Sequence, residues 1–321
     1  KTEAERLAKI FREYCESGRM PEARDLLESR RYLAEAMGLW PERAKAVDDV
    51  VRGALEMDDI EALEGILAKV RWEFLSGETL KAVAERGCLP QDRLGRMEAA
   101  CLALEKGKIA FDAQRFEEAL GHLDAAIATE PDFFLGWSLR GIVLDCLNRS
   151  DEALASWDRA LVLEDDVAGR FGRCIVLYHL GRHEDVVAEL DAILESIPKN
   201  WSAWELRGMA LAKLDRHEEG VASFDRSLQL QPKPETWTER GRSAMALGRA
   251  TEALESFDQA LKLDAGSESA LIGRCEALLR LGRFEEGVAA SDRVLAVNPN
   301  SWWGQTLRGF GLLALGQIEE A

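Results

Sequence analysis

Four histidines are the first residues to consider, because imidazole nitrogens bind metals and exchange protons near neutral pH. They are His122, His179, His183 and His217. His179 and His183 are four residues apart, but a turn is predicted between them at Gly181, so they do not share one helical face. Six cysteines include no Cys-x-x-Cys pair and no zinc-finger spacing. We therefore predict no metal and no catalytic residue, and we interpret the histidines as packing residues near turns.

Nucleotide chemistry is also unsupported by the sequence. Lys106-Gly-Lys108 has no glycine-rich turn before it, and Gly309-Phe-Gly311 follows no strand pattern. Acidic pairs such as Glu218-Glu219 recur where a helix is predicted to begin, and there they interact favourably with the helix dipole. The chain is accordingly predicted not to be an enzyme and to need no cofactor.

Arginine and aspartate residues form the most regular polar pattern, because both recur every 33 or 34 residues. The arginines are Arg140, Arg173, Arg207, Arg240, Arg274 and Arg308, and the aspartates are Asp124, Asp158, Asp191, Asp225, Asp258 and Asp292. Arginines alone would suit an anion-binding stripe. We favour ion pairs between neighbouring repeats, because the two series share one period and have opposite charges.

The same period appears in the apolar residues, with repeats beginning near residues 100, 134, 167, 201, 234, 268 and 302. A small eighth residue and a mostly bulky twenty-fourth residue indicate two helices in close contact. The eighth residues are Gly107, Gly141, Cys174, Gly208, Gly241, Cys275 and Gly309, and the twenty-fourth are Leu123, Trp157, Leu190, Phe224, Phe257 and Ser291. Residues that tolerate positive φ predict turns near 114, 148, 181, 215, 248 and 282.

Three segments carry a resemblance to a known family: Trp137-Ser-Leu-Arg-Gly141, Trp204-Glu-Leu-Arg-Gly208 and Trp237-Thr-Glu-Arg-Gly241. With the period near 34 and prolines such as Pro198 and Pro232 after each second helix, the chain resembles the tetratricopeptide repeat family. The resemblance implies an all-α, right-handed superhelical solenoid of antiparallel helix pairs. The first helix of each pair, helix A, would line the concave face, and the second is helix B.

The resemblance covers residues 100–321, which we predict to form six complete repeats and a truncated seventh. Residues 1–99 are predicted to be an irregular helical N-terminal cap with degenerate repeats at 17–27 and 57–67. A long helix near 91–112 would join the cap to the regular array, with breaks at Gly77, Gly87 and Pro90.

A binding groove is expected on helix A, at positions that face neither helix B nor the next repeat. We predict a groove for a protein or peptide segment that includes Phe111, Ile142, Phe171, Ile175, Tyr178, Met209, Arg242, Met245, Leu279 and Phe310. The residues expected in the groove are apolar in its first half and at its end, so we predict that it binds an apolar or amphipathic segment. The alternative is that some of these residues pack beneath neighbouring helices.

Composition limits the class of partner. The formal net charge is −17, from 41 Lys and Arg against 58 Asp and Glu, which argues against nucleic acid as a direct partner. No run of 18 apolar residues predicts a membrane span, and the cysteine pattern favours the cytoplasm. We expect a non-catalytic interaction scaffold. The alternative is a regulatory or sensor arm of a larger effector, such as a protease or signalling NTPase, whose active domain lies outside these 321 residues. Other segments of that longer chain are then candidate ligands.

Overall fold

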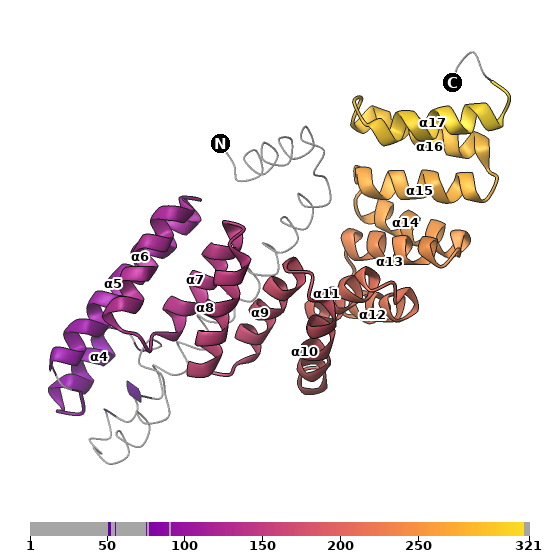
Figure 1. Ribbon diagram of the computed structural model, residues 1–321. Helices are drawn as coiled ribbons and strands as arrows, with labels where there is room; N and C mark the ends of the chain where they lie inside the picture. The colour runs from indigo at the N-terminus through magenta and orange to yellow at the C-terminus, as the bar shows by residue number, and fades with distance from the viewer. Residues whose placement is uncertain (1–50, 53–54, 56–74, 76, 90, 318–321) are drawn as a thin grey trace. The chain divides into compact units, whose positions relative to one another are not determined.

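The computed structural model describes residues 51–52, 55, 75, 77–89 and 91–317 (Figure 1). Within these residues every regular element is an α-helix, which confirms the predicted all-α class. The helices are α4 (Gly77–Glu85), α5 (Gln91–Asp112), α6 (Phe116–Thr129), α7 (Phe134–Cys146), α8 (Ser150–Leu163), α9 (Val167–His179), α10 (His183–Ser196), α11 (Trp201–Lys213), α12 (His217–Leu230), α13 (Pro234–Ala246), α14 (Ala250–Leu263), α15 (Glu268–Arg280), α16 (Phe284–Val297) and α17 (Trp302–Ala314).

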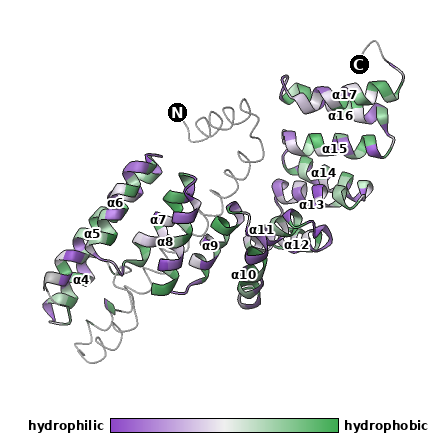
Figure 2. Ribbon diagram, in the orientation of Figure 1, coloured by the Kyte–Doolittle hydropathy of each residue, from purple (hydrophilic) through white to green (hydrophobic). Residues whose placement is uncertain are grey.

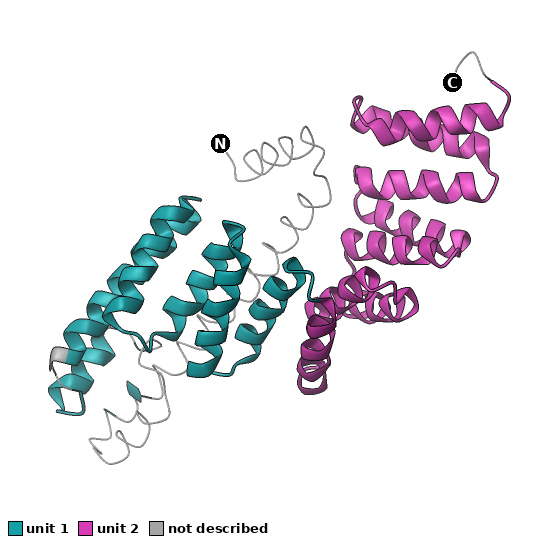
Figure 3. Ribbon diagram, in the orientation of Figure 1, with its two compact units in different colours: residues 1–182 teal, residues 183–321 magenta. Residues whose placement is uncertain are grey.

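The chain divides into two compact units, residues 1–182 and residues 183–321 (Figure 3). In the first unit α5 packs on α6 and α7 packs on α8, while α6 contacts α7 and α8 contacts α9. In the second unit the pairs are α11 with α12, α13 with α14, and α15 with α16, and each pair contacts the next. The predicted division at residue 99 rests on repeat regularity and stays a prediction; the degenerate repeats at 17–27 and 57–67 lie outside the described residues.

Helix pairs are joined by tight turns that end each helix A in the left-handed conformation. Residues with positive φ are Gln114, Asn148, Gly181, Asp215, Gly248, Gly282 and Gly316. The N–H of the next residue then reaches back five residues, as when Arg249 N–H donates to the Ala244 carbonyl at 2.9 Å, which satisfies a carbonyl at the helix end. These positions confirm the six predicted turns. The predicted long helix is also confirmed by α5.

Close helix contact depends on glycine facing an aromatic ring. A Cβ placed on Gly208 would lie 2.7 Å from Phe224, and one on Gly241 would lie 2.7 Å from Phe257. Phe224 and Phe257 are both fully buried. The small eighth residue is therefore required because the aromatic ring occupies the space beside it.

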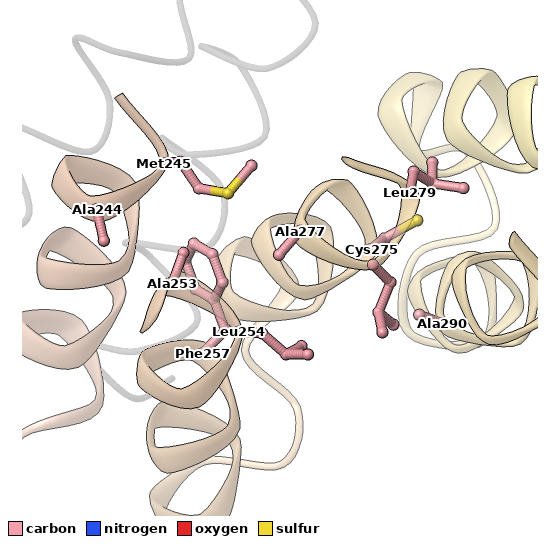
Figure 4. Packing of buried hydrophobic residues seen from close by; sticks show 10 residues of the cluster. Ala244, Met245, Ala253, Leu254, Phe257, Cys275, Ala277, Leu279 and Ala290 are labelled. Carbon is pink, nitrogen blue, oxygen red and sulfur yellow. The ribbon is translucent and has the colours of Figure 1, made fainter. Parts of the chain in front are cut away.

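The hydrophobic core of the second unit continues from one repeat to the next. Figure 4 shows Phe257 of α14 among Ala244 and Met245 of α13, with Cys275 and Leu279 of α15 in the same cluster. Hydrophobic and hydrophilic residues alternate around these helices in Figure 2, as expected for helices with one buried face. Helices α13 and α15 thus contact apolar residues of more than one repeat.

Candidate functional site

The periodic arginines form ion pairs, which confirms that part of the sequence analysis. Each guanidinium Nε on a helix A donates to an aspartate Oδ1 on the preceding helix B. The pairs are Arg140–Asp124 (2.7 Å), Arg173–Asp158 (2.6 Å), Arg207–Asp191 (2.6 Å), Arg240–Asp225 (2.6 Å), Arg274–Asp258 (2.7 Å) and Arg308–Asp292 (2.8 Å). These six guanidinium groups are held by aspartates and do not form an anion-binding stripe.

A serine on the following helix B extends three of these pairs. Arg207 Nη1 donates to Ser223 Oγ at 2.7 Å, and Ser223 Oγ donates to the Glu219 carbonyl at 2.9 Å. Arg140 with Ser156 and Arg240 with Ser256 repeat this arrangement. Each of these arginines therefore joins three helices. The serines were not predicted from the sequence, although each stands sixteen residues after its arginine.

The tryptophan at the fourth position of a repeat is also part of this arrangement. Trp204 Nε1 donates to the Pro198 carbonyl at 2.9 Å, and its ring centroid lies 5.8 Å from the Arg207 guanidinium carbon. In α17 a glutamine occupies the fourth position, and Gln305 Nε2 lies 3.5 Å from the Pro299 carbonyl. The indole thus has a structural role in the loop between repeats.

Acidic residues at the start of helix B pair with the arginine just before the helix. Arg216 donates from Nε and Nη2 to both carboxylate oxygens of Glu219, each at 2.7 Å. These hydrogen bonds lower the pKa of the exposed Glu219 carboxyl and raise the pKa of Arg216. Arg149–Glu152 and Arg283–Glu286 have the same geometry. Ion pairing, in addition to the helix dipole, accounts for these carboxylates.

The predicted groove residues differ widely in exposure. Most of the apolar ones are buried: Ile142 (1% exposed), Phe171 (4%), Ile175 (1%), Tyr178 (6%), Met209 (6%), Met245 (7%) and Leu279 (7%). Phe111 is half-buried, with its ring 5.8 Å from that of Phe116. Arg242 is half-buried and pairs with Glu239 at 2.8 Å, whereas Phe310 is 57% exposed. That these residues form one groove stays a prediction.

Four large apolar side chains are exposed on α17. Trp302 is 64% exposed, Trp303 49%, Phe310 57% and Leu313 56%. At 100° per residue these four side chains fall within one face of the helix. The two indole rings contact each other edge to face, with centroids 4.8 Å apart. We call these four residues the α17 apolar face.

Helix α15, which contacts α17, contains a half-buried carboxylate, Glu276. Burial raises the pKa of its carboxyl group, and the positive charge of Arg280 only partly offsets that effect. Arg280 itself donates to the Met245 carbonyl at 3.4 Å. Glu276 therefore has an unfavourable environment that no hydrogen bond from another described residue relieves.

Histidine chemistry is modest in the part of the chain that the structure describes. His179 Nδ1 lies 2.9 Å from the buried Asp145 carboxylate, and His217 lies 3.6 Å from Asp215 beside the turn. No group of three or more His, Cys, Asp or Glu side chains among the described residues is arranged to hold a metal ion. None of the described helices is long and apolar enough to cross a membrane.

Comparison with family models identifies repeats along most of the regular array. Two models described as tetratricopeptide repeat match residues 104–170 and 175–233, and residues 244–305. Together these segments cover more than half of the chain.

Among curated proteins, a 79-residue segment is 39% identical to the Hsp70-Hsp90 organizing protein of Triticum aestivum. That match covers 25% of this chain and spans only 13% of the relative. It therefore compares a few repeats and not two whole proteins.

Solved structures give the same fold. PilW, a type IV pilus biogenesis factor, has a TM-score of 0.59 at 21% identity and covers 65% of this chain and 97% of its own. Pseudomonas aeruginosa pilF has a TM-score of 0.57 at 16% identity, covering 67% and 99%. The APC/C Cut9–Hcn1 structure has a TM-score of 0.57 at 15% identity, covering 78% and 52%.

Proposed function

Because the chain belongs to the tetratricopeptide repeat family, we propose that it is a non-catalytic scaffold that binds a segment of a partner protein on its helix A surfaces. The observation behind this proposal is the contrast between two sets of residues. The periodic charges are held in ion pairs between repeats, as in Arg207–Asp191, while large apolar side chains such as Phe310 stand exposed on a helix A. Exposed apolar surface of this kind is typical of a site where another protein binds.

The proposed partner is an apolar or amphipathic segment. The six periodic arginines of the described helices already contact aspartates, so they do not offer an unpaired stripe to an acidic ligand. Apolar side chains of a partner would instead be stabilised by leaving water and packing against Phe111 or Phe310. The net charge of −17 supports the exclusion of nucleic acid.

The proposed binding residues fall into two sets, each of which belongs to one compact unit and is considered by itself. Residues 1–182 contain Phe111, Ile142, Phe171, Ile175 and Tyr178, and residues 183–321 contain Met209, Arg242, Met245, Leu279 and Phe310. We propose a cytoplasmic location, which agrees with the five cysteines that the structure describes, all of them free thiols.

The test combines partner identification with calorimetry. Proteins that co-purify with the whole chain are identified by mass spectrometry, and the bound segment is then titrated into wild type and variants. Phe310→Ala is expected to weaken binding by about 1–3 kcal/mol without lowering the melting temperature, because Phe310 is 57% exposed. Tyr178→Ala is expected to weaken binding by about as much with the helical signal intact.

Because Tyr178 is buried, the same test can contradict its role in binding. If Tyr178→Ala lowers thermal stability and leaves the binding constant unchanged, Tyr178 is a packing residue and leaves the proposed site. If neither Tyr178→Ala nor Phe310→Ala changes the affinity of any partner, the helix A surfaces are not the binding site.

A further inference from the structure

Asp145 and His179 form a pair between two neighbouring helices A of the first compact unit. His179 Nδ1 lies 2.9 Å from Asp145 Oδ1 and 3.1 Å from Asp145 Oδ2. Asp145 belongs to the last turn of α7, and His179 is the last residue of α9, which contacts α7. The pair therefore joins two successive repeats at the C-terminal ends of their first helices.

The carboxylate of this pair is buried. The Asp145 side chain is 5% exposed, against 18% for that of His179. Among the described residues, His179 is the one side chain that contacts this carboxylate through a hydrogen bond or an ion pair. A buried carboxylate is unfavourable unless a hydrogen bond or an opposite charge compensates it. The compensation of Asp145 thus depends on the state of one imidazole.

A carboxylate is also exceptional at this place in the repeat. Asp145 is the twelfth residue of its repeat, and the other repeats have an apolar or aromatic residue there. These are Phe111, Tyr178, Ala212, Met245, Leu279 and Leu313. The Asp145 charge therefore serves neither the repeat pattern nor the core, and the contact with His179 is specific to this pair of repeats.

Imidazole gains or loses its charge within the range of about pH 5 to 8. A charged His179 donates a hydrogen bond and also neutralises the buried carboxylate. A neutral His179 with its proton on Nδ1 still donates, but it leaves the negative charge uncompensated. Because the folded pair favours the charged imidazole, its contribution to stability is present at low pH and is lost as the pH rises.

The other charged groups on the elements packed around the pair belong to other pairs or are exposed. The pairs are Arg140–Asp124, Arg149–Glu152, Arg159–Asp132, Arg170–Asp165 and Arg173–Asp158. The exposed groups on α5, α6, α8 and the turn after α9 are Lys108, Asp112, Glu117, Glu118, Asp151 and Arg182. The uncharged titratable side chains beside the pair in sequence are Cys146, Cys174 and Tyr178. Among the described residues, no cation other than His179 pairs with Asp145.

We propose that Asp145 and His179 make the contact between α7 and α9 sensitive to pH, so that it is tight while His179 is charged and looser once His179 is neutral. Tyr178, one of the proposed binding residues, contacts the His179 ring edge to face with centroids 6.2 Å apart. The same change therefore reaches the proposed binding residues of this unit. The inference does not require the scaffold function, and its test needs no partner.

Hydrogen exchange of the whole chain tests the proposal. Mass spectrometry measures protection at about pH 5.5 and about pH 8, on the two sides of imidazole titration, with each value corrected for the intrinsic exchange rate. His179→Asn keeps a neutral donor near the place of Nδ1, and Asp145→Asn removes the buried charge. His122→Asn is the matched control, because His122 lies in the same unit, is 37% exposed and lies 3.9 Å from Glu118.

Protection of α7 and α9 in wild type should fall about tenfold from the lower to the higher pH, relative to α13 and α14, because one pKa unit corresponds to a factor of ten. His179→Asn should have the weaker protection at both pH values, since its neutral side chain never compensates Asp145. Asp145→Asn should lose the dependence on pH. His122→Asn should behave as wild type.

Three results would overturn the proposal. The first is a pH-dependent loss in His179→Asn equal to that in wild type, and the second is a wild-type loss spread equally over both compact units. The third applies even if a variant fails to fold: NMR signals of the His179 ring in wild type that show one charge state at both pH values. Loss of partner binding would change none of these readouts, so failure of the scaffold function is a separate result.

Discussion

Arg207 donates hydrogen bonds to side chains on two different helices, which makes it more than a surface ion pair. Its side chain is 17% exposed, whereas that of its partner Asp191 is 50% exposed. An exposed pair adds little to stability because water and salt screen it. The bond to Ser223 Oγ lies on the more buried side of the guanidinium and satisfies a hydroxyl that is 1% exposed.

We predict that Arg207→Ala lowers the free energy of unfolding by about 1–3 kcal/mol, because the buried Ser223 hydroxyl and Asp191 lose a donor. Urea denaturation measures the change. Arg207→Lys should recover only part of the loss, since an ammonium cannot reproduce the planar geometry of two donors. Asp191→Ala should cost less than Arg207→Ala; the reverse order would show that the aspartate contact dominates.

The reactivity of the Cys275 thiol allows a second prediction about a single side chain. It is fully buried, and burial raises the pKa of its thiol to about 12. The reactive thiolate is therefore scarce at pH 8, and we predict that Cys275 reacts with iodoacetamide only when the protein unfolds. Peptide mass spectrometry after timed alkylation checks this. Labelling of Cys275 in the folded protein at the rate of the half-buried Cys88 would contradict it.

Glycine determines how closely two helices can pack, and two helical glycines give opposite expectations for the free energy of unfolding. Gly241→Ala should lower the free energy of unfolding by about 1–3 kcal/mol, because its Cβ would lie 2.7 Å from Phe257. Gly121→Ala in α6 should stabilise by up to about 1 kcal/mol, since nothing lies within 4 Å and alanine favours helix. Thermal and urea unfolding measure both. Loss of stability in both variants would show that packing does not distinguish them.

Helices and turns were predictable wherever the residues that specify them are close together in the sequence or recur at a fixed period. Gly181 and Gly248 adopt the positive φ expected of them, and Arg240 meets Asp225 because both series share one period. Burial of the groove residues was not predictable in the same way. Helical spacing assigns Ile142 and Phe310 to the same face, but their exposure, 1% against 57%, depends on which other elements cover each helix.

The lack of an ion pair between Glu276 and any described residue likewise could not be predicted from the sequence. Its spacing places it on the groove side of α15, as it places Arg242 on α13. Arg242 donates a hydrogen bond to Glu239, three residues before it, at 2.8 Å. Whether a carboxylate is desolvated and unpaired depends on the depth of packing between helices, which one sequence does not contain.

At the scale of the whole molecule, the two compact units each have their own hydrophobic clusters. A repeat array is stabilised mainly by contacts within and between neighbouring repeats. Gly241→Ala should therefore reduce hydrogen-exchange protection most in α13, α14 and α15, and leave α7 and α8 nearly unchanged. Exchange measured by mass spectrometry tests this locality. An equal loss along residues 91–317 would show that the chain unfolds as a single cooperative body.

The spacing of the Arg–Asp pairs has a consequence for how such a chain can gain or lose length. Every described bond joins one repeat to the repeat before it, and Arg207 lies sixteen residues after Asp191. Excision of residues 201–233 would bring Arg240 to that same separation from Asp191, and Trp237 to the place of Trp204. The ion pairs are thus equivalent between any two neighbouring repeats. In-frame duplication or loss of a repeat during gene evolution would therefore leave each remaining arginine opposite an aspartate of the preceding repeat.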